Sequence, residues 1–184
     1  MDKESKRKGD LFLESMRKLY PLYYGNECRI IPTTVDDGAD YMDKELKIDC
    51  IIEIPFRGYK DKVFRTGIQE RYRSWSDWDR YKDITPSSYY KNSGMLGELY
   101  KMQACHYCQF SADEDADEIK EAVIIHWPTF IAGVTNGLIK PNGKPKTNYS
   151  MGRNIEFIPY HVPHIYEHAK VLWHYKDGVV EHAV

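Results

Sequence analysis

The chain has 184 residues, enough for one domain with a hydrophobic core and too few for two domains of ordinary size. Hydrophobic residues make up 42% of it and aromatic residues 14%, which excludes a disordered chain. No apolar run reaches the roughly 20 residues that a membrane helix needs. The formal net charge of −2 excludes no nucleic-acid partner, because basic residues gather at 57–73 and 140–146, apart from the acidic stretch 113–121. We expect a single soluble domain over residues 1–184 that does not contact a membrane.

The N-terminus and the cysteines both favour a cytoplasmic protein. The first ten residues are charged and lack the apolar core and small-residue cleavage site of a secretion signal. The four cysteines, Cys28, Cys50, Cys105 and Cys108, are typical of reduced thiols in a cytosolic domain. Cys105 and Cys108 form a CxxC pair with no second CxxC at zinc-ribbon spacing, so core cysteines are the favoured interpretation.

In the first part of the chain, apolar residues at three- and four-residue spacing predict a helix that begins after Asp10 and ends at Gly25. A short strand at 28–31 follows. Residues 47–55 and 63–73 are rich in β-branched and aromatic side chains and flank a turn-like segment, which predicts an antiparallel hairpin. The later predicted elements are a short strand at 81–85, a long helix at 95–110, a buried strand at 122–127, a short helix at 129–138, a strand at 155–160 and a closing helix from 163 to about 174.

The predicted hairpin carries the residues that point to a chemistry. Side chains at i and i+2 of a strand share a face, so Gln69, Arg71 and Arg73 lie together on the second strand. The same rule groups Asp49 with Glu53 on the first strand. An acidic residue at the start of one strand is therefore expected to meet the Gln69/Arg71 face of the next. The alternative is a solvated, salt-bridged strand face, with Asp49 only capping a turn.

Phosphodiester hydrolysis requires a hard cation held by oxygen ligands and a nearby positive group that stabilises the transition state. Asp49 offers a carboxylate, Gln69 an amide oxygen and Arg71 the positive group, while the backbone carbonyl of Glu70 is a further candidate ligand. Two further cations, Lys62 and Arg73, are expected to position phosphates. The ion expected at Asp49 and Gln69 is Mg²⁺ or Mn²⁺.

This pattern resembles the PD-(D/E)XK nuclease superfamily, in which an aspartate enters one strand and an acid-x-lysine motif lies on the next. The order helix, three strands, helix, strand is similar over roughly residues 9–127, leaving 128–184 as a C-terminal extension. The resemblance implies an α/β (α+β) fold with a restriction-endonuclease-like core, a mixed central β-sheet flanked by helices. It also implies a metal-dependent nuclease with Asp49, Gln69 and Arg71 in the catalytic positions.

Two residues depart from the family pattern. Arg71 stands at the lysine position and stays protonated, so it stabilises charge but cannot act as a base. Gln69 is neutral, which weakens metal binding unless Glu53, Glu70 or Glu98 assists. The auxiliary helix residues that some members use are matched by Glu98 and Lys101, for which a surface ion pair is the default interpretation.

A different motif lies near the C-terminus. His164, Glu167 and His168 match the HxxEH pattern of inverted zinc peptidases, in which two histidines one helical turn apart bind zinc. The short chain after His168 disfavours a peptidase, whose third ligand lies much further along a larger domain. A His-rich helix packed on the sheet is the favoured interpretation, and a zinc-dependent hydrolase using this motif is the less favoured alternative.

The sequence thus predicts a Mg²⁺-dependent endonuclease or exonuclease acting on nucleic acid, with DNA as the expected substrate. The alternative is a nuclease-like domain that has lost turnover and binds nucleic acid or protein. By analogy with small enzymes that cut duplex DNA, a homodimer is expected. The small stand-alone domain would fit a phage or mobile element.

Overall fold

The computed structural model describes residues 15–33, 46–56, 58, 62–113, 118–149 and 154–181. Among these residues, a seven-stranded sheet has the order β1-β2-β3-β7-β8-β12-β13. Its strands are β1 (Arg29–Pro32), β2 (Cys50–Pro55), β3 (Val63–Ser74), β7 (His106–Asp113), β8 (Glu118–His126), β12 (Val171–Lys176) and β13 (Val179–Glu181). Only the central β3 and β7 pair in parallel, and the other neighbours are antiparallel. The fold is therefore α+β with a mixed central sheet, as predicted.

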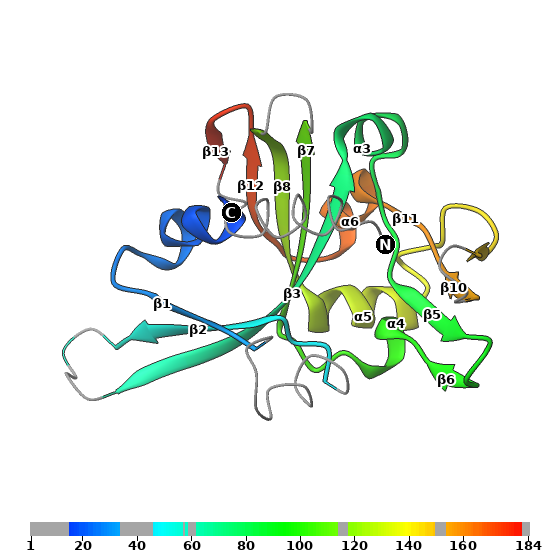
Figure 1. The fold of residues 1–184 in the computed structure, drawn as a ribbon, viewed down its shortest axis with the longest axis horizontal. Coiled ribbons are helices and arrows are strands. Elements are labelled where there is room, and N and C mark those ends of the chain that lie inside the picture. The colour runs from blue at the N-terminus through cyan, green and yellow to red at the C-terminus, as the bar shows by residue number, and fades with distance from the viewer. Residues whose placement is uncertain are drawn as a thin grey trace.

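The remaining elements are α3 (Trp75–Tyr81), β4 (Asp83–Ile84), β5 (Ser87–Tyr90), β6 (Met95–Leu96), α4 (Glu98–Lys101), α5 (Trp127–Thr135), β9 (Lys146–Asn148), β10 (Ile155–Phe157), β11 (Tyr160–His161) and α6 (Val162–His168). Strands β6, β5, β10 and β9 form a second sheet, and β11 pairs with β4. In Figure 1 the second sheet lies to the right of the central strands, beside α4 and α5. None of the helices among the described residues is long and apolar enough to cross a membrane.

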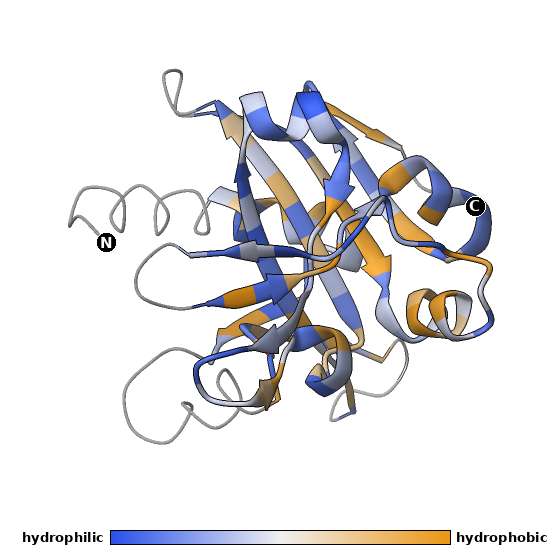
Figure 2. Ribbon diagram, turned by 90° about the vertical axis from the view of Figure 1, so that its right-hand side faces the viewer, coloured by the Kyte–Doolittle hydropathy of each residue, from blue (hydrophilic) through white to orange (hydrophobic). Residues whose placement is uncertain are grey.

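Two apolar layers cover the two faces of the central sheet. On one face, Met16 and Tyr20 of the helical segment 15–24 pack with Phe110 and Trp173 of the strands. On the other face, side chains of α3, α4, α5 and α6 pack on the same strands. Apolar and polar residues alternate along strands in Figure 2, as expected for strands with differing faces. The sheet is thus sandwiched between helices, and the candidate site lies on the α3–α6 face.

Several predicted elements are confirmed. The antiparallel hairpin is formed by β2 and β3, with Cys50 opposite Ile68 and Pro55 opposite Val63. The first strand, the buried strand β8 and the helix α5 occur where expected within a few residues. The first helix occupies residues 15–24, and its predicted start at Asp10 lies outside the described residues.

Three predicted elements need correction. The long helix at 95–110 is wrong, because only α4 is helical there and the segment ends in β7, which pairs with β3. The closing helix ends at His168, and β12 extends the central sheet by pairing with β8. The predicted strand at 81–85 is shortened to β4, since α3 continues to Tyr81. The C-terminal segment therefore adds strands to the same sheet as the hairpin.

A partly buried ion network joins the end of α3 to β8 and β12. Glu121 accepts hydrogen bonds from Lys82 Nζ at 2.8 Å and from His174 Nε2 at 3.0 Å. Burial alone would raise the pKa of Glu121, but the hydrogen bonds from His174 and Lys82 lower it to about 2. The network therefore stabilises the folded state while the Glu121 carboxyl group is ionised.

We expect this network to make the fold acid-sensitive. Because the pKa of Glu121 falls on folding, its contribution is present above the ordinary value of 4.5 and is lost as the pH drops towards 2. The loss should reach about 3 kcal/mol of unfolding free energy. Urea unfolding from pH 6 to pH 2 measures it, with Glu121→Gln as the comparison. An equal loss in that variant would contradict the assignment.

Candidate active site

Asp49 and Gln69 lie opposite each other where β2 and β3 begin to pair. The backbone N–H of Asp49 donates to Ile68 O at 2.8 Å, so the antiparallel pairing extends one residue before β2. Gln69 Nε2 and the backbone N–H of Glu70 both donate to Asp49 Oδ2, each at 2.6 Å. The juxtaposition predicted from strand alternation is therefore present, and two hydrogen bonds fix the Asp49 carboxylate.

The side-chain oxygen of Gln69 is an unsatisfied acceptor. Gln69 is 1% exposed, and its Oε1 accepts no hydrogen bond from any residue that the structure describes. Leaving a buried acceptor unpaired costs about 1–3 kcal/mol, so such an atom calls for a partner. In the structure the amide nitrogen of Gln69, not its oxygen, faces the Asp49 carboxylate. With the amide turned by 180°, a cation between the carboxylate and the amide oxygen would supply the partner, and these oxygens suit Mg²⁺.

Arg71 and Glu98 form an ion pair across the site. Glu98, at the start of α4, is buried and also accepts a hydrogen bond from the Ser87 N–H at 3.3 Å, while the Arg71 side chain is 38% exposed. The lack of a side chain at Gly97 lets the start of α4 lie against β5, since a Cβ there would stand 2.3 Å from Ser87 O. The expected Glu98–Lys101 surface pair is thus replaced by a buried carboxylate that holds the Arg71 guanidinium. Lys101 ends the same short helix.

Arg73 marks the other end of the polar face. Its Nη1 donates to Asp83 O at 2.8 Å and pairs with the Asp83 carboxylate on β4. The guanidinium also lies 5.9 Å from the ring centre of Tyr81, an exposed tyrosine. Arg80 and Lys146 lie 5.1 and 5.5 Å from the same ring. The ring and these three cations, here called the Tyr81 patch, make a positive aromatic surface beside the site.

The other predicted residues lie elsewhere. The Glu70 side chain points to the opposite face of the sheet, where it pairs with Arg17 and Tyr20. Glu53 pairs with Arg65 further along the hairpin, and Lys62 lies just before the outer end of β3. The structure therefore brings together Asp49, Gln69, Arg71, Arg73 and Glu98, and the side chains of Glu53, Glu70 and Lys62 lie away from them.

Sequence reasoning missed three contributors, Asp83, Ser87 and Gln109. Asp83 lies in the predicted strand at 81–85 and Ser87 just after it, and both contact the site only through tertiary pairing. Gln109 Nε2 donates to Arg71 O at 3.0 Å from the neighbouring strand β7. Its segment has the spacing of a helix, which hides the strand alternation that would place Gln109 on this face.

No protein-family model, curated protein or solved structure matches this chain.

Proposed function

We propose that this protein is a Mg²⁺-dependent nuclease with a restriction-endonuclease-like core, and that it hydrolyses phosphodiester bonds in nucleic acid, with DNA as the expected substrate. The observation that carries the proposal is the Asp49 carboxylate beside the buried, unsatisfied Gln69 Oε1. The strand order β1-β2-β3-β7-β8, with a parallel centre, supports it, because three consecutive strands are followed, after α3 and α4, by a strand that joins the same sheet.

The residues of this site fit a divalent cation. Asp49, Gln69 Oε1 and the backbone carbonyl of Glu70 would hold the ion, an all-oxygen set of the kind that Mg²⁺ and Mn²⁺ prefer. Such an ion activates a water molecule and polarises the phosphate. Asp49 stays oriented through its hydrogen bond from the backbone N–H of Glu70.

Arg71 supplies the positive charge at the scissile phosphate. Its side chain is 38% exposed, so a phosphate can reach it, and Glu98 fixes its position from the buried side. Because a guanidinium stays protonated, Arg71 stabilises developing negative charge and takes no proton. Glu98 acts through Arg71 and is a positioning residue.

The Tyr81 patch supports nucleic acid as the substrate. Cations bind phosphates, and an exposed aromatic ring offers a stacking surface for an unpaired base. Arg80 and Lys146 form no ion pair with any residue that the structure describes, so both charges are available to a polyanion. Arg73 joins this patch to the strand that carries Gln69 and Arg71.

One observation favours a second candidate, a domain that binds nucleic acid without cutting it. Arg71 is already paired with Glu98, which reduces the charge it offers to a phosphate. A binder would use the Tyr81 patch and show salt-sensitive affinity. The cytoplasmic location and the homodimer expected from the sequence stay predictions in either case.

The test is cleavage of labelled single- and double-stranded DNA and RNA, with Mg²⁺ or Mn²⁺ against chelator. We expect cleavage only with metal. If the folded protein binds these nucleic acids with salt-sensitive affinity but cuts none of them, the binding domain would take the place of the nuclease as the supported function. A folded protein that neither binds nor cuts these nucleic acids would contradict both candidate functions.

A further inference from the structure

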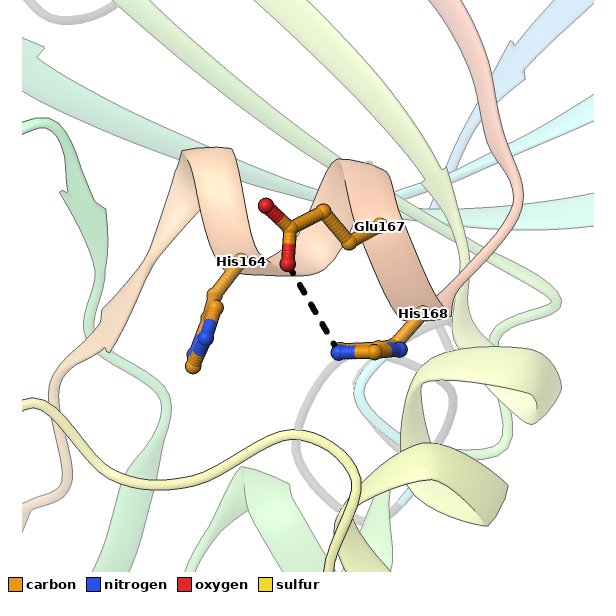
Figure 3. Close-up of side chains that lie close together, drawn as sticks. All are labelled: His164, Glu167 and His168. Atoms are coloured by element: carbon orange, nitrogen blue, oxygen red, sulfur yellow. Dashed lines mark ion pairs between the residues drawn. The ribbon is translucent and has the colours of Figure 1, made fainter.

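A second group of metal-ligating side chains lies on α6, outside the candidate active site. His164, Glu167 and His168 are all exposed, and their imidazole nitrogens and carboxylate oxygens lie within 4.8 Å of one another. His168 Nε2 is 3.7 Å from Glu167 Oε2, and the two histidine rings are 5.7 Å apart. Figure 3 shows both rings projecting from the same side of the helix, with the carboxylate turned towards His168. The three residues therefore form one cluster.

The backbone of α6 is held firmly, so the cluster stands on a fixed base. Val162 and Ile165 are buried in the core beneath the helix. The Val162 N–H donates to Lys82 O and the Ala169 N–H donates to Ile165 O, each at 2.8 Å, so both ends of the helix are bonded. Positions i, i+3 and i+4 share one face of a helix. Only side-chain rotations are then needed to bring the three ligand atoms onto one ion.

The chemistry of these ligands selects a transition metal rather than Mg²⁺. Imidazole nitrogen suits zinc, copper, cobalt and nickel, whereas Mg²⁺ prefers oxygen ligands alone. Two nitrogens and one carboxylate oxygen leave a tetrahedral zinc ion one open position, which water fills. Among the described residues, Glu167 has no lysine or arginine ion-pair partner, so its charge is available to a cation.

We propose that His164, Glu167 and His168 bind one Zn²⁺ ion or a similar divalent transition metal, with all three as ligands and water at the open position. Here Glu167 is a ligand and not a catalytic base, which separates this site from the zinc-hydrolase alternative. The proposal does not rest on the nuclease function, because none of these residues belongs to the Asp49 site.

The test is a calorimetric titration of Zn²⁺ into the chelator-treated, tag-free full chain, with Co²⁺ absorption as a second readout of nitrogen ligands. We expect one equivalent of Zn²⁺ to bind. His164→Ala and His168→Ala should each abolish this uptake, and Glu167→Gln should weaken it. The matched control is His161→Ala, an exposed histidine just before the helix and outside the cluster, which should keep the full equivalent.

Asp49→Ala separates the two metal sites. This variant should leave zinc uptake unchanged. The nuclease proposal can therefore fail while the zinc proposal stands, and the zinc proposal can fail while the nuclease proposal stands. Absence of zinc uptake by the folded wild type would overturn the zinc proposal. So would full uptake by the His164→Ala/His168→Ala double variant, or loss of uptake in Asp49→Ala. Because all three ligands are exposed, circular dichroism should show an unchanged fold in every cluster variant.

Discussion

The Asp49→Asn variant is expected to lose metal-dependent cleavage while it stays folded. Asparagine is nearly isosteric and keeps one oxygen that can accept hydrogen bonds from Gln69 and Glu70. It removes the one negative charge that would hold a cation beside the neutral Gln69. Loss of an outer-shell partner lowers metal affinity or activity roughly 10–100-fold, so loss of the charged ligand should exceed that. Cleavage rates over a Mg²⁺ titration, with thermal unfolding in parallel, measure the effect.

The matched control is Asp79→Asn, which removes the same charge from an exposed residue of α3. It should cut at the wild-type rate. An Asp49→Asn protein that cuts as fast as this control would remove Asp49 from the mechanism. Excess Mn²⁺ should recover part of the lost activity, because the defect lies in metal binding.

The hairpin and its central pair of residues could be predicted because their signals are local. β-branched residues indicate two strands, and alternation along them predicts, without tertiary information, that Asp49 meets the Gln69/Arg71 face. The same rule put the Glu70 side chain on the opposite face, where the structure has it. A side-chain period of two is a property of any strand, so these placements needed only the correct assignment of the strands.

The segment 95–110 shows where local signals fail. Met95, Leu99, Met102 and His106 have helical spacing, yet the chain is helical only over α4 and then enters β7. β7 pairs in parallel with β3 and is buried on both faces, as Tyr107 and Cys108 show. Such a strand has no apolar–polar alternation, so its sequence resembles that of a buried helix.

The ion pairs of the site were beyond sequence reasoning for a related reason. Arg71 pairs with Glu98 across a connection that includes β5 and β6 of the second sheet, and Arg73 pairs with Asp83 across α3. Such pairs depend on how α4 and β4 pack on the central sheet. Spacing along the chain instead favoured the local pair of Glu98 with Lys101, which would have been weak on an exposed helix.

The ion pair with the largest expected effect on stability lies on the opposite face from the site. Arg17 Nη2 donates to Glu70 Oε2 at 2.9 Å, and Tyr20 Oη donates to Glu70 Oε1 at 2.6 Å, with the Glu70 side chain 1% exposed. Removing one partner of a buried pair leaves an uncompensated charge and costs about 3–5 kcal/mol. We therefore expect Arg17→Met to lower the free energy of unfolding by about 3 kcal/mol.

Urea unfolding at neutral pH measures this loss, and two further variants test its cause. Arg65→Met breaks the exposed pair with Glu53 and should cost less than about 1 kcal/mol. Glu70→Gln added to Arg17→Met should recover part of the loss, because the neutral amide can still accept the hydrogen bond from Tyr20. A double variant no more stable than Arg17→Met would assign the loss to packing of the arginine stem. Since the Glu70 side chain points to the face of β3 opposite Asp49, we expect cleavage by folded Arg17→Met protein to equal that of the wild type, which would assign stabilisation to one face of β3 and the proposed catalysis to the other.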